Sequence, residues 1–229
     1  MTPYRDDAAG ALEYCPNEVE QREPLRSLTL YPIIKRTVDI LGSTFGLIVL
    51  SPLFAAVAVA IKWEDPKGPV FFSQTRIGKN GKPFQIYKFR SMCVDAEEKL
   101  KNMRDKNDIS GPMFKIKEDP RITKVGKFIR RTSIDELPQF LNVLKGEMSL
   151  VGPRPSVIWE VDQYTNHDKK RLAVTPGCTG LWQISGRNEL GFHEMLELDL
   201  AYIEKKCIWF DMRIMLKTVK IMISSKGAY

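Results

Sequence analysis

The densest group of reactive side chains in this chain lies at residues 130–138, which read Arg-Arg-Thr-Ser-Ile-Asp-Glu-Leu-Pro. Asp135 and Glu136 follow Arg130 and Arg131 at the expected start of a helix. An ionised aspartate can attack a phosphorus atom and form an acyl phosphate. A neighbouring glutamate can hold Mg²⁺, an ion that keeps few protein carboxylates and several phosphate or water oxygens. Both carboxylates are therefore candidate catalytic residues, and Glu136 is a candidate ligand of Mg²⁺.

The same residues also have a purely structural explanation. Ser133 and Glu136 have the spacing of a capping box, and acids in a first turn complement the helix dipole. With Ser133 as cap, Pro138 would be the fifth helical residue and would remove a backbone hydrogen bond, whereas with Asp135 as cap no bond is lost. The second arrangement leaves Glu136 without a capping task. In either case we expect the helix N-terminus and the two preceding arginines to lower the pKa of these carboxylates.

Five bases are candidates for binding a phosphate or another part of an anionic substrate: Lys88, Arg90, Arg130, Arg154 and Arg187. Lys88 and Arg90 would project from one face of a strand, although a solvated sheet edge is the commoner reason for such a pattern. Arg154 stands between two prolines, and its planar fork suits bidentate binding of phosphate, or bracing of a loop. Arg187 lies in the polar loop 183–188, which could contact a base or a diphosphate, or be a simple turn. The sequence contains no G-x-G-x-x-G motif and no P-loop.

Residues 40–61 form an uncharged stretch of 22 residues, which indicates a membrane element. At about 1.5 Å per residue, a straight helix of this length would cross a hydrocarbon core of about 30 Å. Pro52 argues against a straight helix, since it provides no N–H for the carbonyl of Ile48. The Ser51 hydroxyl or a bend would then have to satisfy that carbonyl. Bases on both flanks favour a re-entrant helix broken at Ser51-Pro52, with both ends cytoplasmic, over a spanning helix.

The remaining pattern predicts an α+β fold that is mainly α-helical, with amphipathic interfacial helices and a small β-hairpin. We expect a poorly ordered polar leader at 1–32, the re-entrant helix at 33–62 and a cytoplasmic, membrane-associated domain at 63–229. The expected strands are Val70–Phe72 and Phe84–Phe89, joined through an Asn80-Gly81 turn, and the expected helices cover 93–106, 125–131, 135–144, 159–172 and 190–206. The last helix has one apolar face, made by Met212, Met215, Leu216, Val219, Met222 and Ile223, which either lies on an anionic bilayer or packs in the core.

The charge distribution narrows the classes of partner. Residues 1–30 hold six acids and three bases, whereas the remaining residues hold 32 bases and 22 acids, a net charge of +10. A basic body beside a membrane element suggests anionic lipid head groups, phosphates or nucleotides as partners. The four cysteines show no metal-ligand spacing and suit a reducing cytoplasm. A nucleic-acid-binding protein is disfavoured, because no recognisable binding motif occurs.

Several short motifs follow one another in one order: Lys35-Arg36 before the apolar run with Ser51-Pro52, Tyr87-Lys88-Phe89-Arg90-Ser91-Met92, Asp119-Pro120-Arg121-Ile122-Thr123, Ser133-Ile134-Asp135-Glu136-Leu137-Pro138-Gln139, Val151-Gly152-Pro153-Arg154-Pro155, Pro176-Gly177 and Ser185-Gly186-Arg187-Asn188. This order resembles the bacterial sugar transferases, the monotopic phosphoglycosyl transferases that act as polyprenyl-phosphate hexose-1-phosphate transferases. The resemblance covers about residues 35–229. Each motif alone is weak, but their common order is specific.

The resemblance implies transfer of a sugar 1-phosphate from a UDP-sugar to undecaprenyl phosphate, with release of UMP, at the start of capsule, exopolysaccharide or O-antigen assembly. It implies that Asp135 is the nucleophile that forms a covalent phosphosugar intermediate and that Glu136 binds Mg²⁺. It places Arg154 near a phosphate, Arg187 near the uridine, and Lys88 and Arg90 among the basic positions of the site. The family's helix break falls on Ser51-Pro52.

Large members of that family carry a spanning helix bundle and a further domain, so this chain resembles a form with the catalytic domain alone. The segment 95–117 resembles that of enzymes that handle galactose or glucose 1-phosphate. The implied location is the cytoplasmic face of the bacterial inner membrane, and a homo-oligomer is an open alternative to a monomer. The competing hypothesis is a non-catalytic membrane adaptor of a polysaccharide assembly complex, which would have no use for the Asp135-Glu136 pair.

Overall fold

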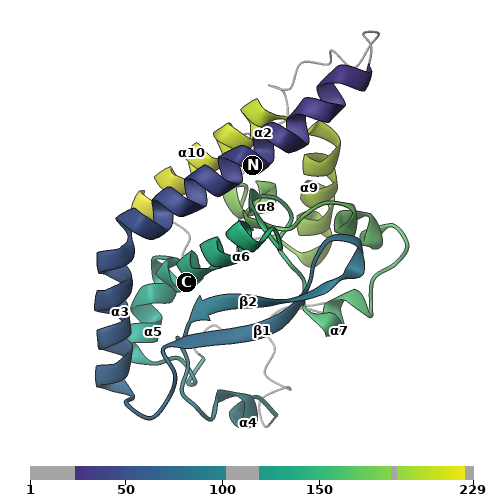
Figure 1. Cartoon of the computed structure of the whole chain (residues 1–229). Coiled ribbons are helices and arrows are strands. Elements are labelled where there is room, and N and C mark those ends of the chain that lie inside the picture. The colour runs from purple at the N-terminus through teal and green to yellow at the C-terminus, as the bar shows by residue number, and fades with distance from the viewer. Residues whose placement is uncertain (1–23, 102–118, 187–189, 225–229) are drawn as a thin grey trace.

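The described part of the chain is mainly α-helical and carries two small β-sheets, which confirms the predicted α+β class (Figure 1). The computed structural model describes residues 24–101, 119–186 and 190–224. Its α-helices are α2 (Pro24–Val49), α3 (Ser51–Glu64), α4 (Ala96–Lys101), α5 (Lys124–Arg131), α6 (Phe140–Lys145), α7 (Ile158–Val161), α8 (Leu181–Ile184), α9 (Phe192–Lys205) and α10 (Ile208–Ser224). Its 3₁₀ helices are η1 (Lys79–Gly81), η3 (Ile134–Gln139) and η4 (Asp168–Ala173), and its strands are β1 (Phe71–Ile77), β2 (Pro83–Phe89), β3 (Ser149–Val151) and β4 (Gly177–Thr179).

A sharp bend separates α2 from α3 at the residues predicted to break the membrane helix (Figure 1). Leu30–Val49 and Ser51–Glu64 are bent by 58° relative to one another. Pro52 lies in the first turn of α3, where its missing N–H costs no helical hydrogen bond. The Ser51 hydroxyl donates to the carbonyl of Ile48 at 2.8 Å. The predicted break, and its satisfaction by Ser51, are therefore confirmed.

The first helix of this pair is longer than predicted. It begins at Pro24, before the expected start of the membrane element at residue 33. Residues 1–23 lie outside the described part, and the leader at 1–32 stays a prediction. Within the described ranges, no single helix is both long and apolar enough to span a bilayer alone, whereas α2 and α3 taken together meet that requirement.

The bases at the start of the apolar run contact the body of the protein. Lys35 Nζ lies 2.7 Å from a carboxylate oxygen of Asp211 in α10. Arg36 donates to the carbonyls of Val143 at 2.6 Å and Leu144 at 2.8 Å. These carbonyls lie at the C-terminal end of α6, where a cation is favourable. The two bases therefore attach α2 to the body.

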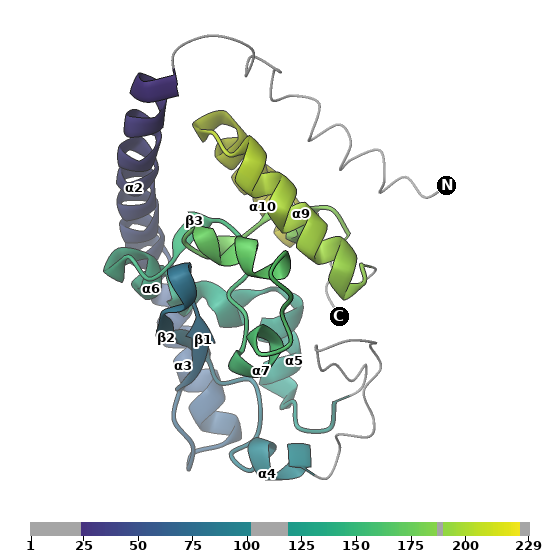
Figure 2. The ribbon, with the colours of Figure 1, turned by 90° about the vertical axis from the view of Figure 1, so that its right-hand side faces the viewer.

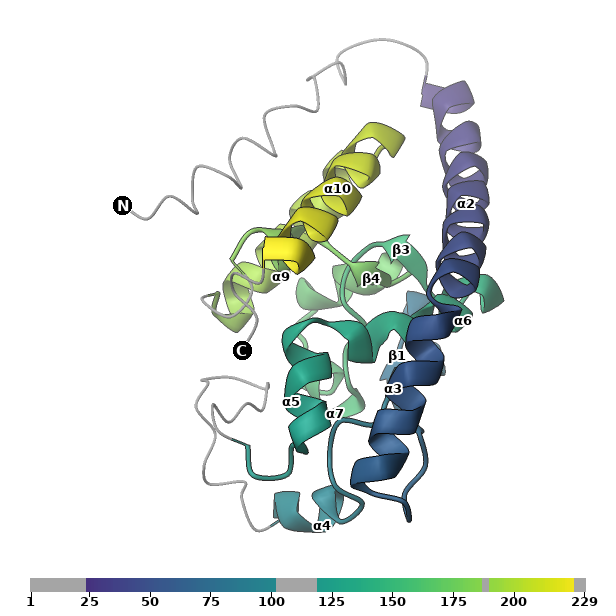
Figure 3. The ribbon, with the colours of Figure 1, turned by 90° about the vertical axis from the view of Figure 1, so that its left-hand side faces the viewer.

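The far end of the bent pair is attached to the same body. The Glu64 carboxylate accepts hydrogen bonds from the backbone amides of Lys124 at 2.7 Å and Val125 at 2.9 Å, the first residues of α5. The next residue, Asp65, pairs with Arg90 at 2.6 Å. Figure 3 shows α3 lying beside α5. Both ends of the pair are thus fixed to one body.

The predicted hairpin is present, but its first strand is longer than expected. β1 and β2 pair in antiparallel register from Phe71 with Phe89 to Ile77 with Pro83. Asn80 and Gly81 have left-handed φ values of 57° and 76°, as an Asn-Gly turn requires. Arg76, which the sequence pattern assigned to the turn, lies on β1.

A second, parallel sheet of two short strands was not predicted. β3 pairs with β4 through Ser149 with Gly177 and Val151 with Thr179. The strands approach so closely that a Cβ atom at position 177 would lie 2.1 Å from the backbone nitrogen of Gly152. Only glycine fits at position 177.

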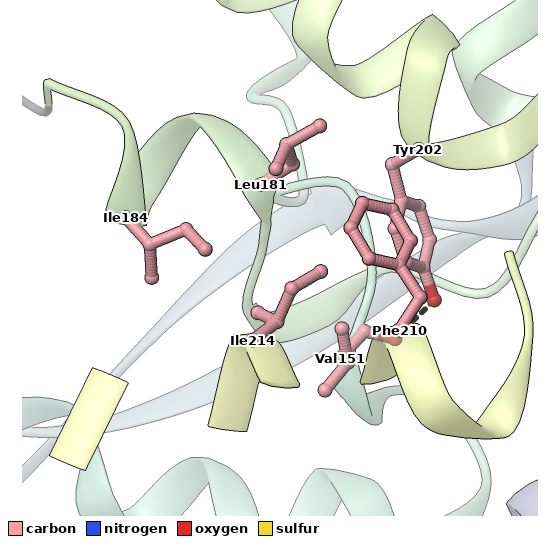
Figure 4. Close-up of a cluster of buried hydrophobic side chains, with 6 residues drawn as sticks. All are labelled: Val151, Leu181, Ile184, Tyr202, Phe210 and Ile214. Carbon is pink, nitrogen blue, oxygen red and sulfur yellow. Dashed lines mark hydrogen bonds between the residues drawn. The ribbon is translucent and has the colours of Figure 1, made fainter. Parts of the chain in front are cut away.

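The main apolar core lies between β3, α8, α9 and α10 (Figure 4). It consists of Val151, Leu181, Ile184, Tyr202, Phe210 and Ile214. Figures 2 and 3 show α2 and α10 on either side of β3. The core therefore fixes β3, which leads directly into the loop that carries Arg154.

Three predicted helices differ from the structure. The helix expected at 135–144 is a 3₁₀ helix, η3, that continues into α6. The helix expected at 159–172 is divided into α7 and η4, because Thr165 and Asp168 exchange side-chain-to-backbone hydrogen bonds that begin η4 separately. In α10, the face that packs on the core contains Phe210 and Ile214, whereas Met212 on the predicted apolar face is exposed. The helices expected at 125–131 and 190–206 are present as α5 and α9. The helix expected at 93–106 is present as α4, and residues 102–118 lie outside the described part.

Candidate active site

Asp135 and Glu136 lie in the first turn of η3, whose start differs from both capping arrangements considered above. Ser133 precedes η3 in the left-handed conformation, with φ of 57°, and its side chain caps no backbone amide. The helix already begins at Ile134, so Asp135 is not the cap either. Both carboxylates are therefore left for other contacts.

Glu136 is held between two cations that come from separate elements. Its Oε1 atom lies 2.6 Å from Lys88 Nζ and 2.8 Å from Arg154 Nη2, and its Oε2 atom lies 3.3 Å from Arg154 Nη1. Burial alone would raise the pKa of Glu136, but the charges of Arg154 and Lys88 outweigh burial and hold the pKa well below its usual range. Glu136 is therefore an ionised carboxylate.

Asp135 has the opposite electrostatic environment, although it is the preceding residue. Its side chain is buried, with a relative exposure of 8%. Burial and the negative charge of Glu136 raise the pKa of Asp135 to about 6, against the opposing charges of Lys88, Arg130 and Arg154. The expectation of a lowered pKa was therefore wrong for Asp135, because burial outweighs the nearby bases.

One buried amide fixes the strand of Lys88 relative to η3. Asn142 of α6 is fully buried. Its side chain accepts a hydrogen bond from the Tyr87 amide at 3.0 Å and donates to the Gln85 carbonyl at 2.6 Å. Because α6 directly continues η3, this contact sets the distance between β2 and the carboxylate pair.

The structure brings three of the five candidate bases to the carboxylate pair. Lys88 and Arg154 contact Glu136, and Arg130 acts on Asp135 through its charge. Arg90 instead binds the side chain and carbonyl of Asp65 at 2.6 and 2.9 Å, and a Cβ atom at Gly68 would overlap its guanidinium group. Arg90 therefore holds the end of α3, away from Glu136. Arg187 lies outside the described residues.

The carboxylate pair offers few free oxygens to a magnesium ion. Among the residues described, no group of three or more His, Cys, Asp or Glu side chains is placed to hold a metal ion. Oε1 of Glu136 already accepts two hydrogen bonds, whereas Oε2 accepts one, from Arg154. Oε2 thus leaves room for one further contact, and a Mg²⁺ ion bound there would take its other ligands from phosphate and water. Mg²⁺ binding by Glu136 stays a prediction.

Two arginines behind Arg154, the half-buried Arg76 and the buried Arg171, were missed by the reasoning from sequence. Arg76 of β1 donates to the Pro155 carbonyl at 3.2 Å, and Arg171 of η4 donates to the Arg154 carbonyl at 3.1 Å. Burial and the charge of Arg154 lower the pKa of Arg76 to about 10. Arg76 was assigned to a turn and Arg171 to a long helix, so neither was singled out. Continuing the first strand to Ile77 would have placed Arg76 in the sheet.

The site therefore combines two carboxylates of different acidity with at least three positive charges. Such an arrangement suits phosphoryl transfer, which needs positioning and charge neutralisation more than elaborate covalent chemistry.

Comparison with known proteins gives a consistent result. The family model described as bacterial sugar transferase matches residues 30–225. The galactosyl transferase CpsE of Streptococcus agalactiae is 50% identical over 197 residues, which cover 86% of this chain and 43% of that protein. The undecaprenyl-phosphate galactose phosphotransferase of Salmonella typhimurium is 44% identical over 200 residues, or 86% of this chain and 42% of that protein. The exopolysaccharide production protein ExoY of Sinorhizobium fredii is 39% identical over 201 residues, or 86% of this chain and 88% of that protein. This chain thus spans less than half the length of the first two relatives.

Proposed function

We propose a function from the premise that this chain belongs to the bacterial sugar transferase family. The chain transfers a hexose 1-phosphate from a UDP-sugar to undecaprenyl phosphate and releases UMP. The observation that carries the proposal is the contact of Glu136 with Lys88 and Arg154 beside the buried Asp135. Relatives named for galactose transfer and for undecaprenyl phosphate support these substrates. We take galactose as the first candidate hexose and glucose as the second, and exopolysaccharide or capsule synthesis as the process.

In the first step, a carboxylate oxygen of Asp135 attacks the sugar-bearing phosphorus of the UDP-sugar. An oxygen–phosphorus bond forms, the bond between that phosphorus and the bridging oxygen breaks, and UMP leaves with the electron pair. In the second step, a phosphate oxygen of undecaprenyl phosphate attacks the same phosphorus and releases the Asp135 carboxylate. A pKa of about 6 leaves Asp135 mostly ionised at neutral pH, as this role requires.

The cations at the site have a clear task in both steps, because donor and acceptor are both anionic. Lys88 and Arg154 offset negative charge that develops on the transferred phosphate and on departing UMP. When bound, Mg²⁺ supplies further neutralisation at the phosphates, and Glu136 is the residue that would hold it. A covalent intermediate lets the two anions use the site in turn.

We further propose that α2 and α3 enter the cytoplasmic leaflet of the inner membrane as a re-entrant pair and leave on the same side. Attachment of both ends of the pair to one body supports this arrangement. Apolar side chains near the bend are exposed, among them Leu41, Phe45 and Ile48 at 66–69% relative exposure. Leu216, on the outer face of α10, is exposed to the same degree and would contact the bilayer, where anionic lipids would attract the basic body.

The proposal is tested by UMP release from UDP-galactose and UDP-glucose in nanodiscs that contain undecaprenyl phosphate. Asp135→Asn is expected to abolish release while the protein remains folded and membrane-bound. Asp162→Asn, which changes an exposed acid of the same type, serves as the matched control and is expected to keep full activity. Full activity of Asp135→Asn would overturn the mechanism. A wild-type protein that binds nanodiscs but releases no UMP from either donor would favour a membrane adaptor.

A further inference from the structure

Residues 153–156, Pro-Arg-Pro-Ser, are held through their carbonyl oxygens. The two prolines have no N–H group, so the segment offers few donors of its own. The carbonyl of Pro153 accepts from the Gly177 amide at 2.8 Å, and that of Ser156 accepts from the Ile77 amide at 2.9 Å. These outer contacts join the segment to β4 and to β1.

The two inner carbonyls accept hydrogen bonds from charged side chains. Arg171 Nη2 lies 3.1 Å from the carbonyl oxygen of Arg154, and Arg76 Nη1 lies 3.2 Å from that of Pro155. Four consecutive carbonyls are therefore bound by four residues from three elements, β4, η4 and β1. Hydrogen bonds from a charged donor are stronger than those from a neutral donor. The backbone of Arg154 is therefore held more firmly than backbone amides alone would hold it.

Arg171 is itself immobilised by buried partners. Its Nη2 atom forms an ion pair with Asp199 of α9, and its Nη1 atom donates to the Tyr164 hydroxyl at 2.7 Å. The Asp199 side chain is fully buried, and that of Arg171 is 8% exposed. Both terminal nitrogens of Arg171 are occupied, so it acts through its neighbours and does not bind substrate.

We propose that Arg171, held by Asp199, is a positioning residue that fixes the backbone of Arg154 so that its guanidinium group meets the Glu136 carboxylate with two nitrogens. Its effect on turnover rests on the proposed function, whereas its effect on the side chain of Arg154 does not. Removing the Arg171 contact frees the Arg154 carbonyl, and the fork of Arg154 then loses its fixed alignment. Bidentate geometry is sensitive to such a shift, because both N–H groups must point at one carboxylate.

The first test observes Arg154 directly by ¹⁵N NMR of its guanidinium group in the detergent-solubilised full chain. The Arg154 signal is assigned by its loss in Arg154→Lys. Restricted rotation of the group is expected in the wild-type protein, and free rotation is expected in Arg171→Gln. Arg121→Gln, which removes another buried arginine paired with an aspartate, is the matched control and is expected to leave the Arg154 signal unchanged. An unchanged signal in folded Arg171→Gln would overturn the proposal.

A milder variant guards against a failure of Arg171→Gln to fold. Tyr164→Phe keeps the ion pair of Arg171 and removes the hydrogen bond from its Nη1 atom, so partial loosening of the Arg154 signal is expected. Ser156→Ala is the matched control, because the Tyr164 hydroxyl also contacts the Ser156 hydroxyl at 2.6 Å, and it is expected to leave the Arg154 signal unchanged. If Arg171→Gln does not fold and Tyr164→Phe leaves the Arg154 signal unchanged, the proposed positioning role of Arg171 is overturned.

The second test uses turnover and separates positioning from general destabilisation. We expect Arg171→Gln to lower UMP release about tenfold or more, and Arg171→Lys to recover part of the loss. In an Arg154→Ala background, Arg171→Gln is expected to lower release no further, since both changes remove the same contact. Losses that multiply would overturn the proposal. If the wild-type protein releases no UMP, the proposed function fails, and the NMR test still decides the role of Arg171.

Discussion

Asp135 and Glu136 are adjacent in the chain, yet their carboxyl groups differ widely in acidity. Glu136 faces two cations within 2.8 Å, whereas Asp135 is buried and has Glu136 as a negative neighbour. Such a separation between paired titratable groups is typical of catalytic sites, because it assigns a different role to each. Here it leaves Asp135 as the more basic carboxylate, as its proposed role as nucleophile requires, and Glu136 as an ionised carboxylate at neutral pH.

Asp135→Asn is expected to stabilise the folded protein at pH 7.5. The pKa of Asp135 is about 6 in the folded state and ordinary in the unfolded state, so the folded state holds the proton between about pH 4 and 6. The contribution of Asp135 to the free energy of unfolding is therefore highest below pH 4, falls as the pH rises through 6, and is constant at higher pH. We expect a gain on the order of 1–3 kcal/mol at pH 7.5 and none near pH 4, measured by denaturant unfolding. A loss of stability at pH 7.5 would contradict this assignment.

Activity is expected to rise with pH through a limb near pH 6 as Asp135 loses its proton. Lys88 is the strongest of the charges that lower this pKa. Lys88→Met should therefore move the limb to higher pH and also lower the maximal rate at least about tenfold, since it removes a cation that we propose to offset charge on the transferred phosphate. The measurement is the rate of UMP release between pH 5 and 8. Lys127→Met, a change of an exposed lysine on α5, should leave the limb in place.

The parts of this structure that were predicted from sequence depend on local chemistry. Ser51-Pro52 breaks the helix because proline removes a neighbouring hydrogen bond, and Asn80-Gly81 forms a turn because both residues accept left-handed φ values. The carboxylate pair was found because Pro138 made simple capping by Ser133 doubtful. Each of these features is determined within a few residues of the chain.

The parts that were not predicted depend on contacts between distant residues. Lys88 and Arg90 are two residues apart and were expected on one face of a strand. Lys88 pairs with Glu136, however, whereas Arg90 pairs with Asp65. The pairing of β3 with β4, the burial that raises the pKa of Asp135, and the face of α10 that packs on the core are likewise decided by tertiary packing. No pattern within a single segment contains this information.

The close approach of β3 and β4 makes position 177 intolerant of any side chain. Gly177→Ala would place a Cβ atom 2.1 Å from the Gly152 nitrogen, and backbone atoms cannot move aside as a flexible side chain can. We expect a loss of stability of about 2–4 kcal/mol, together with lost activity, because the strands carry the Arg154 loop. Gly191→Ala is the control, since its Cβ atom would meet nothing closer than 4.0 Å. Equal thermal stability of the two variants would contradict this packing.

The ion pair of Lys35 with Asp211 is expected to hold α2 on α10. Asp211 also accepts hydrogen bonds from Tyr31 and Tyr202, at 3.0 and 2.8 Å. Lys35→Met alone leaves a buried carboxylate without its cation and should cost about 2–4 kcal/mol. The double variant Lys35→Met, Asp211→Leu should recover part of that loss, because no unpaired charge remains. Thermal unfolding in nanodiscs measures both, and equal or greater loss in the double variant would contradict a dominant charge effect.

The re-entrant path of α2 and α3 predicts that both ends of the pair react with a membrane-impermeant thiol reagent on one side only. After replacement of the native cysteines, Ile34→Cys and Lys67→Cys place single thiols at exposed positions, the first early in α2 and the second just after α3. Both are expected to be labelled in inverted vesicles and protected in right-side-out vesicles, since both ends contact the same body. Phe45→Cys, near the bend, is expected to resist the reagent in both preparations because the proposed arrangement places it in lipid. Labelling of positions 34 and 67 from opposite sides would show that the pair spans the membrane.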